Sequence, residues 1–358
     1  MKKFLCLFMS ITIIISTLSC SKNNSLIVNT TKETREFTDS LNRTIILPKE
    51  INRVAVTGPL TQIIIFGIGA DKLVGTALPF PKESIKYFKE KHTTLPVLGQ
   101  LYGGKGQLNI ETLIEANPDV IIDIGETKST MINDFNSLTE KTGIPFIHIT
   151  FNLNNIEHCY NKLGELFDRN EKAQEIIAYC KNTLKEAEMG KKMFGKANVT
   201  YCLGKNGLNV ICENSYFSEV IDLVANNVCK LDTPSNKGSG NEIDMEQMIK
   251  FNPDYIIFET KELMENIPKK PEWTDISAIK NNNYYLVPQI PYNILGFPPG
   301  IQQMLGIKWL LRILYPGFIN SRIEDECRHF YKLFFDIDLT DEDINFILNK
   351  DINNKELY

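Results

Sequence analysis

The sequence predicts an α/β protein of two similar lobes, each with a mostly parallel central sheet, joined by one long helix. A helix–turn–strand phrase occurs twice in the same register, as NIETLIEANPDVII at 109–122 and DMEQMIKFNPDYII at 244–257. Between the copies, the stretch after Asp168 has apolar residues at helical spacing and no proline or glycine before Gly190. Duplication of one βα element explains the repeat. The alternative is that Asn-Pro-Asp before an apolar strand is a common connection in α/β proteins.

The elements of the first lobe, 36–168, follow in order. A hairpin is expected around Ser40–Arg43, then a strand at 53–58, a helix opened by Pro59 and a strand at 72–77. A glycine-rich loop leads into the first copy of the phrase, and GIPFIHIT at 143–150 supplies another strand. Strands that alternate with helices indicate parallel βα units.

The remaining chain divides into three parts. The long helix is expected at 169–195, and at ~1.5 Å per residue it is about as long as a small domain is wide. The βα alternation resumes in a second lobe at 196–318, which holds the second copy of the phrase. Shorter amphipathic helices are expected within 319–358.

Composition excludes one class of partner. With 358 residues, the chain is long enough for two apolar cores, and 43% hydrophobic with 23% charged residues is typical of a soluble globular protein. The net charge is −5, and no basic stripe with interleaved aromatic residues occurs. We therefore expect no nucleic-acid partner.

The first 20 residues have the pattern of a secretory signal. MKK is followed by an apolar run that is short for a membrane span, and Leu18-Ser19-Cys20 resembles a bacterial lipobox. We expect cleavage before Cys20, a lipid on its sulfur, and a flexible tether at 21–35. The protein would then be anchored in the cell membrane, outside the cytoplasm. The alternative is an uncleaved amino-terminal anchor.

Cysteine and histidine residues show no metal-binding or catalytic spacing. Besides Cys6 and Cys20, the chain has Cys159, Cys180, Cys202, Cys212, Cys229 and Cys327, without a CxxC pair. We expect free core thiols, although an exported chain also permits disulfides. The histidines His92, His148, His158 and His329 are isolated, and no GxSxG, HExxH or phosphate-binding loop occurs. We expect no enzyme, no resident cofactor and no metal site; a two-lobed enzyme or metallocluster scaffold is the alternative.

Two such lobes leave a cleft where the carboxyl ends of their strands face each other. Loops that follow predicted strands supply the candidate ligand contacts. In the first lobe these are Thr57, Pro59, Phe80, Tyr102 and Lys105, with the loop at Glu126–Thr127; in the second they are Lys205, Tyr216, Lys237, Tyr292 and Asn293. The aromatic residues are the more informative candidates, because aromatic side chains in loops often form ligand walls.

With these motifs in view, the chain resembles the helical-backbone (class III) periplasmic-binding-protein family, from about Arg35 to Leu348. The resemblance rests on FTDSLNRTIILPKEINRVAV, GADKLVG, both copies of the repeated phrase, GIPFIHI and PPGIQQMLGIKWLLRILYP. It implies a lipoprotein receptor that captures a solute and delivers it to the permease and ATPase subunits of an ABC importer. It further implies that Glu111 and Glu246 dock on the permease, that the long helix restricts closure, and that the receptor is a monomer.

The resemblance leaves the ligand open among iron–siderophore complexes, haem and cobalamin. An iron complex of siderophore type is the first expectation, because such receptors are common in this family. Anionic chelates favour arginine or lysine, and the candidate loops hold only three lysines. Haem would use an axial ligand such as Tyr102 or Tyr292, and cobalamin would use aromatic and amide contacts.

Overall fold

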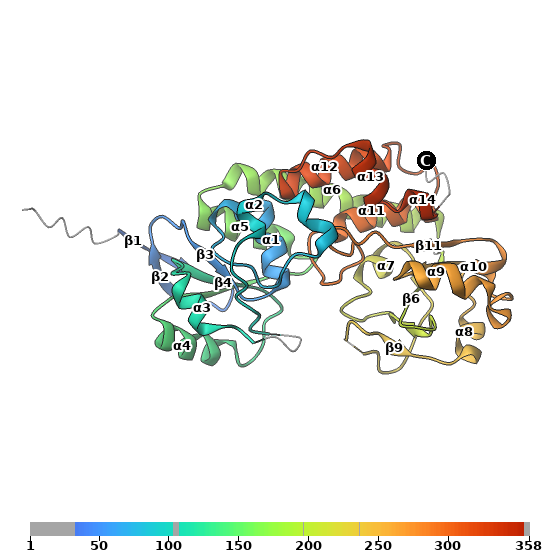
Figure 1. Cartoon of the computed structure of the whole chain (residues 1–358), viewed down its shortest axis with the longest axis horizontal. Helices are drawn as coiled ribbons and strands as arrows, with labels where there is room; N and C mark the ends of the chain where they lie inside the picture. Colours follow the sequence, from blue (N-terminus) through green and yellow to red (C-terminus); the bar gives the residue numbers. More distant parts are fainter. Residues whose placement is uncertain (1–32, 103–106, 196, 236, 354–358) are drawn as a thin grey trace, which may run out of the picture.

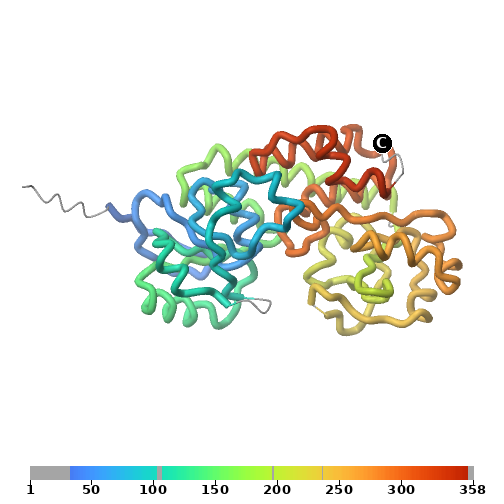
Figure 2. The backbone as a smooth tube through the Cα atoms, in the orientation of Figure 1, coloured from blue at the N-terminus to red at the C-terminus, as the bar shows by residue number. Residues whose placement is uncertain are grey.

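The computed structural model describes residues 33–353 except 103–106, 196 and 236. Two α/β lobes lie side by side, with α6 and the carboxyl-terminal helices running along one side of both (Figure 1). The tube view shows that the chain passes from one lobe to the other through α6 and returns over the top as the last helices (Figure 2). This arrangement confirms the predicted fold class. The boundaries proposed for the separate segments stay a prediction.

The first lobe is built on a parallel sheet in the order β3-β4-β5, beside the separate antiparallel hairpin β1-β2. Its elements are β1 (Thr34–Thr38), β2 (Thr44–Pro48), β3 (Val54–Val56), α1 (Pro59–Gly69), α2 (Glu90–Thr93), α3 (Ile110–Glu115), β4 (Val120–Gly125), α4 (Met131–Thr142), β5 (Phe146–Thr150) and α5 (Ile156–Phe167). The prediction of a strand at 72–77 is wrong. That stretch forms only isolated bridges, from Leu73 to Val54 and from Thr76 to Val97, because it changes partner after two residues.

The second lobe has a sheet in the order β11-β10-β6-β7-β9, with β8 paired to β6. The strands β6, β8, β10 and β11 run parallel, while β7 and β9 are antiparallel. Its elements are β6 (Asn198–Leu203), β7 (Asn209–Val210), α7 (Glu219–Val224), β8 (Asn226–Asn227), β9 (Asn241–Glu242), α8 (Met245–Phe251), β10 (Tyr255–Phe258), α9 (Lys261–Asn266), α10 (Ser277–Lys280) and β11 (Tyr284–Leu286).

The repeated phrase forms the same structure in both lobes. It gives α3 and β4 in the first lobe and α8 and β10 in the second, and each strand lies between two parallel neighbours. Asn117 and Asn252 both adopt left-handed backbone, with φ of 43° and 39°, which asparagine tolerates. Asp119 and Asp254 each accept a backbone N–H from the start of the neighbouring strand. The shared geometry supports duplication.

A layer of helices packs against both lobes. The helix α6 (Asn170–Phe194) has 25 residues, about 37 Å at ~1.5 Å each, and matches the predicted long helix. It packs on α5 of the first lobe and on α7 and α11 (Gln303–Leu314) of the second. The chain then adds α12 (Ile323–Phe335), α13 (Asp341–Ile347) and α14 (Lys350–Asn353). Among the residues described, no helix combines the length and apolar character needed to cross a bilayer.

The expectation that all six later cysteines are free thiols is wrong for one pair. Cys212 and Cys229 form a disulfide, with their Cα atoms 4.6 Å apart and a separation of 17 positions in the sequence. The loop around α7 brings the two positions together, which their spacing alone did not show. Cys159, Cys180, Cys202 and Cys327 are buried and free, as expected of small core side chains.

Removing this disulfide should destabilise the protein. Closing a loop of this length stabilises a fold by roughly 3 kcal/mol, because it restricts the unfolded chain. The double variant Cys212→Ala/Cys229→Ala should lose about that much unfolding free energy in denaturant titrations. Wild-type protein in reductant should match the variant, and the variant itself should not respond to reductant. A wild type whose stability is the same with and without reductant contradicts the assignment.

Candidate ligand-binding site

A cavity of about 330 Å³ lies between the two lobes. The first lobe contributes the turn after β3, the end of β4 and the segment after it; the second lobe contributes two loops. The lining residues are Thr57, Gly58, Pro59, Leu60, Thr61, Gln100, Tyr102, Asp123, Ile124, Gly125, Glu126, Lys128, Met131, Tyr216, Phe217, Pro298 and Pro299. Its volume is within the range of small-molecule sites, roughly 300–1,000 Å³.

Parallel strands place the first-lobe residues at the cavity. β3 and β4 pair in parallel, so the residues after their carboxyl ends, Thr57 and Glu126, emerge at the same edge of the sheet. The backbone N–H of Thr57 donates to the carbonyl of Ile122, and its own carbonyl accepts from Leu101 N–H at 2.7 Å. The second bond brings the Tyr102 loop over the same edge.

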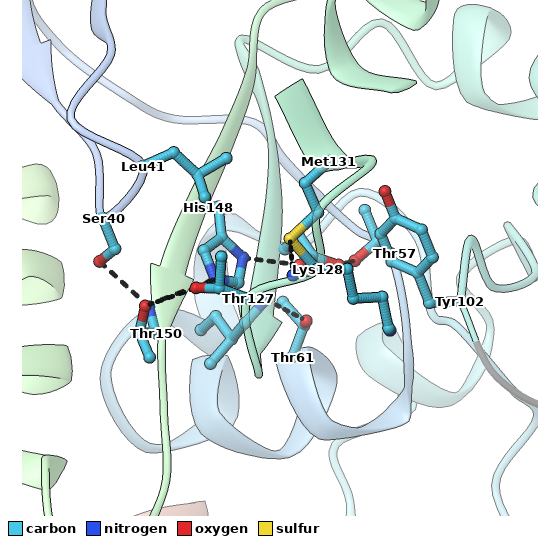
Figure 3. A network of polar contacts seen from close by, with 12 residues as sticks. Ser40, Leu41, Thr57, Thr61, Tyr102, Thr127, Lys128, Met131, His148 and Thr150 are labelled. Carbon is cyan, nitrogen blue, oxygen red and sulfur yellow. Dashed lines mark hydrogen bonds and ion pairs between the residues drawn. The ribbon is translucent and has the colours of Figure 1, made fainter. Parts of the chain in front are cut away.

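A polar network that is buried at Asp123 and His148 forms the floor of the cavity (Figure 3). The Thr57 hydroxyl donates to Asp123, and the other carboxylate oxygen of Asp123 lies 2.8 Å from His148 Nδ1. His148 Nε2 lies 3.3 Å from the Thr127 hydroxyl, which in turn lies 3.3 Å from that of Thr150. Asp123 and His148 are almost fully buried. Because both carboxylate oxygens of Asp123 are bonded within the protein, we assign it a structural role beneath the site.

Tyr102 is held in place at one wall. Its hydroxyl donates to Asp134 Oδ2 at 2.8 Å, and the Thr130 hydroxyl donates to the same oxygen. Burial, followed by the Asp134 carboxylate, raises the pKa of Tyr102. The ammonium of Lys128 lies 4.1 Å from the centre of the ring, a favourable cation–π distance. The wall is therefore a fixed aromatic ring with a cation on its face.

The opposite wall belongs to the second lobe and is also aromatic. Tyr216 and Phe217 precede α7, and their rings meet edge to face with centroids 5.4 Å apart. Phe217 stacks on Phe297 at 4.6 Å, which ties this loop to the segment before α11. Burial raises the pKa of Tyr216 to about 12, so its hydroxyl stays protonated at neutral pH. A ligand in this cavity would contact rings from both lobes.

A second interlobe cavity, of about 580 Å³, shares Glu126 and Tyr216 with the first. Its lining residues are Glu126, Asn152, Asn154, Asn214, Ser215, Tyr216, Glu219, Asp222 and Leu223. Glu219 accepts a hydrogen bond from the backbone N–H of Leu153, across the lobes, at 3.3 Å. Burial, the largest cause, raises the pKa of Glu219 and also that of Asp222. We call this space the acidic cavity.

Another cavity, of about 560 Å³, lies away from the strand ends, between α1 and α12. Most of its charged residues are paired with each other: Lys89 with Asp336 at 2.5 Å, and Arg169 with Asp71 at 2.7 Å. These pairs satisfy its charges without a ligand, and the carboxyl ends of the strands do not reach it. The interlobe cavities are therefore the better candidates.

Four of the ten predicted contacts line the first interlobe cavity: Thr57, Pro59, Tyr102 and Tyr216. Lys105 lies outside the residues that the structure describes. The remaining five do not line either interlobe cavity: Phe80, Lys205, Lys237, Tyr292 and Asn293.

Three of those five, Phe80, Tyr292 and Asn293, contact other parts of the protein instead. The Phe80 ring lies 4.4 Å from that of Phe88. The Tyr292 hydroxyl accepts from Gln62 Nε2 at 3.2 Å, and Asn293 is buried with its amide donating to the Tyr201 hydroxyl at 2.9 Å. These partners come from distant segments. The loop positions alone therefore could not show which way the side chains turn.

Sequence reasoning also missed residues that line the cavities. Lys128 and Phe217 lie within two residues of nominated positions, so their loops were found but not the side chains; Pro298 belongs to a segment that was not nominated. Glu219 belongs to a helix, and a glutamate in a first turn gives no signal of a cavity.

Fold and cavities together define a two-lobed solute-binding protein. The chain belongs to the periplasmic binding protein family, whose model matches residues 54–291. Members of this family are transport components of ABC importers rather than enzymes, and they work outside the cytoplasm.

Relatives of this chain differ in what they bind. The molybdate-binding protein MolA of Haemophilus influenzae is 22% identical over 84% of this chain and 91% of its own length. The iron-uptake system-binding protein of Bacillus subtilis is 24% identical over 51% of this chain and 59% of its own. A solved ABC transporter solute-binding protein of Sulfurospirillum deleyianum superposes with a TM-score of 0.79 and 27% identity, covering 88% of this chain and 99% of that one.

Half-buried Glu219 should make stability depend on pH. Its pKa is raised above the usual 4.5, so the folded state binds more protons than the unfolded state above that pH. Stability from this group therefore falls as pH rises from about 4.5 through the raised pKa. Glu219→Gln should melt at a higher temperature than wild type at pH 7.5, with the difference vanishing near pH 4. Glu272→Gln, at an exposed position, is the control and should leave the melting temperature unchanged at both pH values. A lower melting temperature for Glu219→Gln at pH 7.5 contradicts this account.

Proposed function

We propose that this protein is the receptor of an ABC importer that captures an iron complex of siderophore type between its lobes and delivers it to the permease. The observation that carries the proposal is the interlobe cavity, whose opposite walls are Tyr102 and Tyr216 over a fixed polar floor. Two aromatic faces suit a flat or globular chelate, because rings offer large contact areas at low entropic cost. The iron-uptake relative agrees with an iron complex.

Cobalamin or haem is the second candidate for the ligand. The aromatic walls also suit a macrocycle, and the Tyr102 hydroxyl is the kind of axial donor that haem uses. However, that hydroxyl already donates to Asp134, which favours a wall over a metal ligand.

The receptor is proposed to stay at the cell membrane through a lipid on Cys20. That residue and the preceding signal lie outside the described part of the chain. The support is the Leu18-Ser19-Cys20 motif at the end of the apolar run.

Loss of one aromatic wall should weaken binding. Tyr102→Ala removes a large contact, and such losses cost about 1–3 kcal/mol of binding free energy. Calorimetric titration with ferric trihydroxamate and tricatecholate complexes should show the loss for whichever complex the wild type binds. Phe346→Ala, which removes an exposed ring on α13, is the control and should bind normally. If the wild type binds none of these iron complexes, or if Tyr102→Ala binds as wild type does, the proposal is wrong.

Glu111 and Glu246 are proposed to dock the receptor on its permease. Both occupy the second position of their helix, after the caps Asn109 and Asp244. Both are exposed, and neither pairs with a described lysine or arginine. Figure 1 shows α3 and α8 in different lobes, both on the side away from α6. The helix dipole alone favours a carboxylate there by ~0.3–1 kcal/mol, which is the competing explanation.

Charge reversal separates the two explanations. Rim ion pairs fix the register of a complex, so Glu111→Lys and Glu246→Lys should each impair uptake, and the double change should impair it further. Ligand affinity should stay at the wild-type value, measured on the purified receptor. Glu115→Lys and Lys250→Glu on the same two helices are control reversals that should transport normally. Normal uptake by the double variant would leave the dipole as the whole explanation.

A further inference from the structure

We propose that the ligand carries an organic cationic group, such as an ammonium or amidinium, which occupies the acidic cavity between Glu126 and Glu219. The inference rests on the proposed function and narrows its substrate class to metal complexes with a positively charged arm or edge. It is drawn from the charges, burial and partners of the residues that line the acidic cavity.

The charged side chains that line the acidic cavity are all negative. Its described lining holds three carboxylates, those of Glu126, Glu219 and Asp222, and no lysine, arginine or histidine. Neither Glu126 nor Glu219 forms an ion pair with a described cationic side chain. In the adjoining cavity, the described lysine is Lys128, and its ammonium lies over the Tyr102 ring. A negative potential concentrated between low-dielectric walls attracts cations and repels anions.

The carboxylates of the acidic cavity differ in burial: Glu219 and Asp222 are half-buried, and Glu126 is exposed. Glu219 accepts a hydrogen bond from the backbone N–H of Leu153, and a side-chain hydrogen bond with Gln303 also favours its charged form. A buried carboxylate without an opposite charge is disfavoured, as its raised pKa reflects. The negative charges of Glu126 and Asp222 add to that effect. A bound cation would offset this penalty on the charged form of Glu219.

The neutral residues of the acidic cavity add hydrogen-bonding capacity. Asn152 and Asn154 come from the first lobe, and Asn214 and Ser215 from the second. Ser215 is only 6% exposed, and its hydroxyl has no hydrogen-bond partner among the described atoms. Buried hydroxyl groups are normally bonded, so the Ser215 hydroxyl has hydrogen-bonding capacity to spare beside the acidic cavity.

A bare metal ion does not fit the same observations. Among the described residues, no three histidine, cysteine, aspartate or glutamate side chains converge closely enough to hold one. Divalent ions bind through several ligands at about 2–2.6 Å, whereas an ammonium needs only hydrogen-bond contacts to separate carboxylates. An oxyanion, or the propionates of haem, would meet like charge here. An organic cation is the class that remains.

Two pairs of probes, each differing by one positive charge, test this inference. Ferrioxamine B is a ferric trihydroxamate with a free ammonium, and its N-acetylated form lacks that charge. Aquocobalamin is cationic at neutral pH, and cyanocobalamin is neutral. Titration calorimetry at pH 7 should show tighter binding of the charged member of whichever pair the wild type binds, by about 10- to 100-fold, as for a hydrogen bond to a charged group.

Substitution of the cavity glutamates tests whether the acidic cavity causes the preference for the charged probe. Glu126→Gln and Glu219→Gln should each reduce the preference by about tenfold or more, mainly by weakening the charged probe. Glu272→Gln, an exposed carboxylate outside both interlobe cavities, is the matched control and should keep the full preference. Melting curves at pH 7 verify that each variant is folded.

Each outcome bears on a different claim. Binding of both members of a pair with equal affinity, or a preference that survives Glu126→Gln and Glu219→Gln, overturns the inference and leaves the proposed function standing. Tight binding of molybdate by the wild type, unaffected by these variants, also overturns the inference. Failure of the wild type to bind any of the four chelates overturns the inference, and failure to bind the ferric tricatecholates as well overturns the proposed function.

Discussion

The packing of α6 against α11 fixes the geometry of everything else. Gly190 brings the two helices into close approach: a Cβ atom there would lie 2.8 Å from a methyl of Leu311 and 3.1 Å from the Phe318 ring. Nearby, Lys308 of α11 is buried, with its ammonium 2.5 Å from Glu186 of α6 and 3.6 Å from Glu326 of α12. Breaking a buried pair of this kind is costly, because it leaves an uncompensated charge. The three helices therefore behave as one support.

This support explains how a cavity can exist before a ligand arrives. The helix α6 packs on α5 in one lobe and on α7 in the other, so the loops at the strand ends face each other at a set separation. In the first lobe, the Thr57–Asp123–His148 network holds the floor. A site whose parts are held by packing and hydrogen bonds loses little freedom on binding. The proposed preference of the acidic cavity for a cationic ligand would then operate in a cavity whose shape is already set.

The sequence predicted the repeated architecture better than the site, for physical reasons. Backbone placement follows local patterns: the Asn-Pro-Asp turns at Asn117 and Asn252 and the apolar spacing of α6 are each encoded within a few turns of chain. Side-chain direction depends on distant partners instead. Tyr102 and Tyr292 are both aromatic residues in loops, yet one lines the cavity and the other packs near Phe335 of α12, at 6.4 Å between ring centres. The Cys212–Cys229 disulfide likewise depends on how the chain folds around α7.

The central claim is that a metal complex binds between the two aromatic walls, and crystallography at the iron absorption edge tests it most directly. Crystals grown with ferrioxamine B should give one strong anomalous peak in the interlobe cavity, between Tyr102 and Tyr216. The lobes should keep the separation seen here, because α6 is held along its length. A peak in the cavity between α1 and α12, or a complex bound to one lobe alone, would contradict the account.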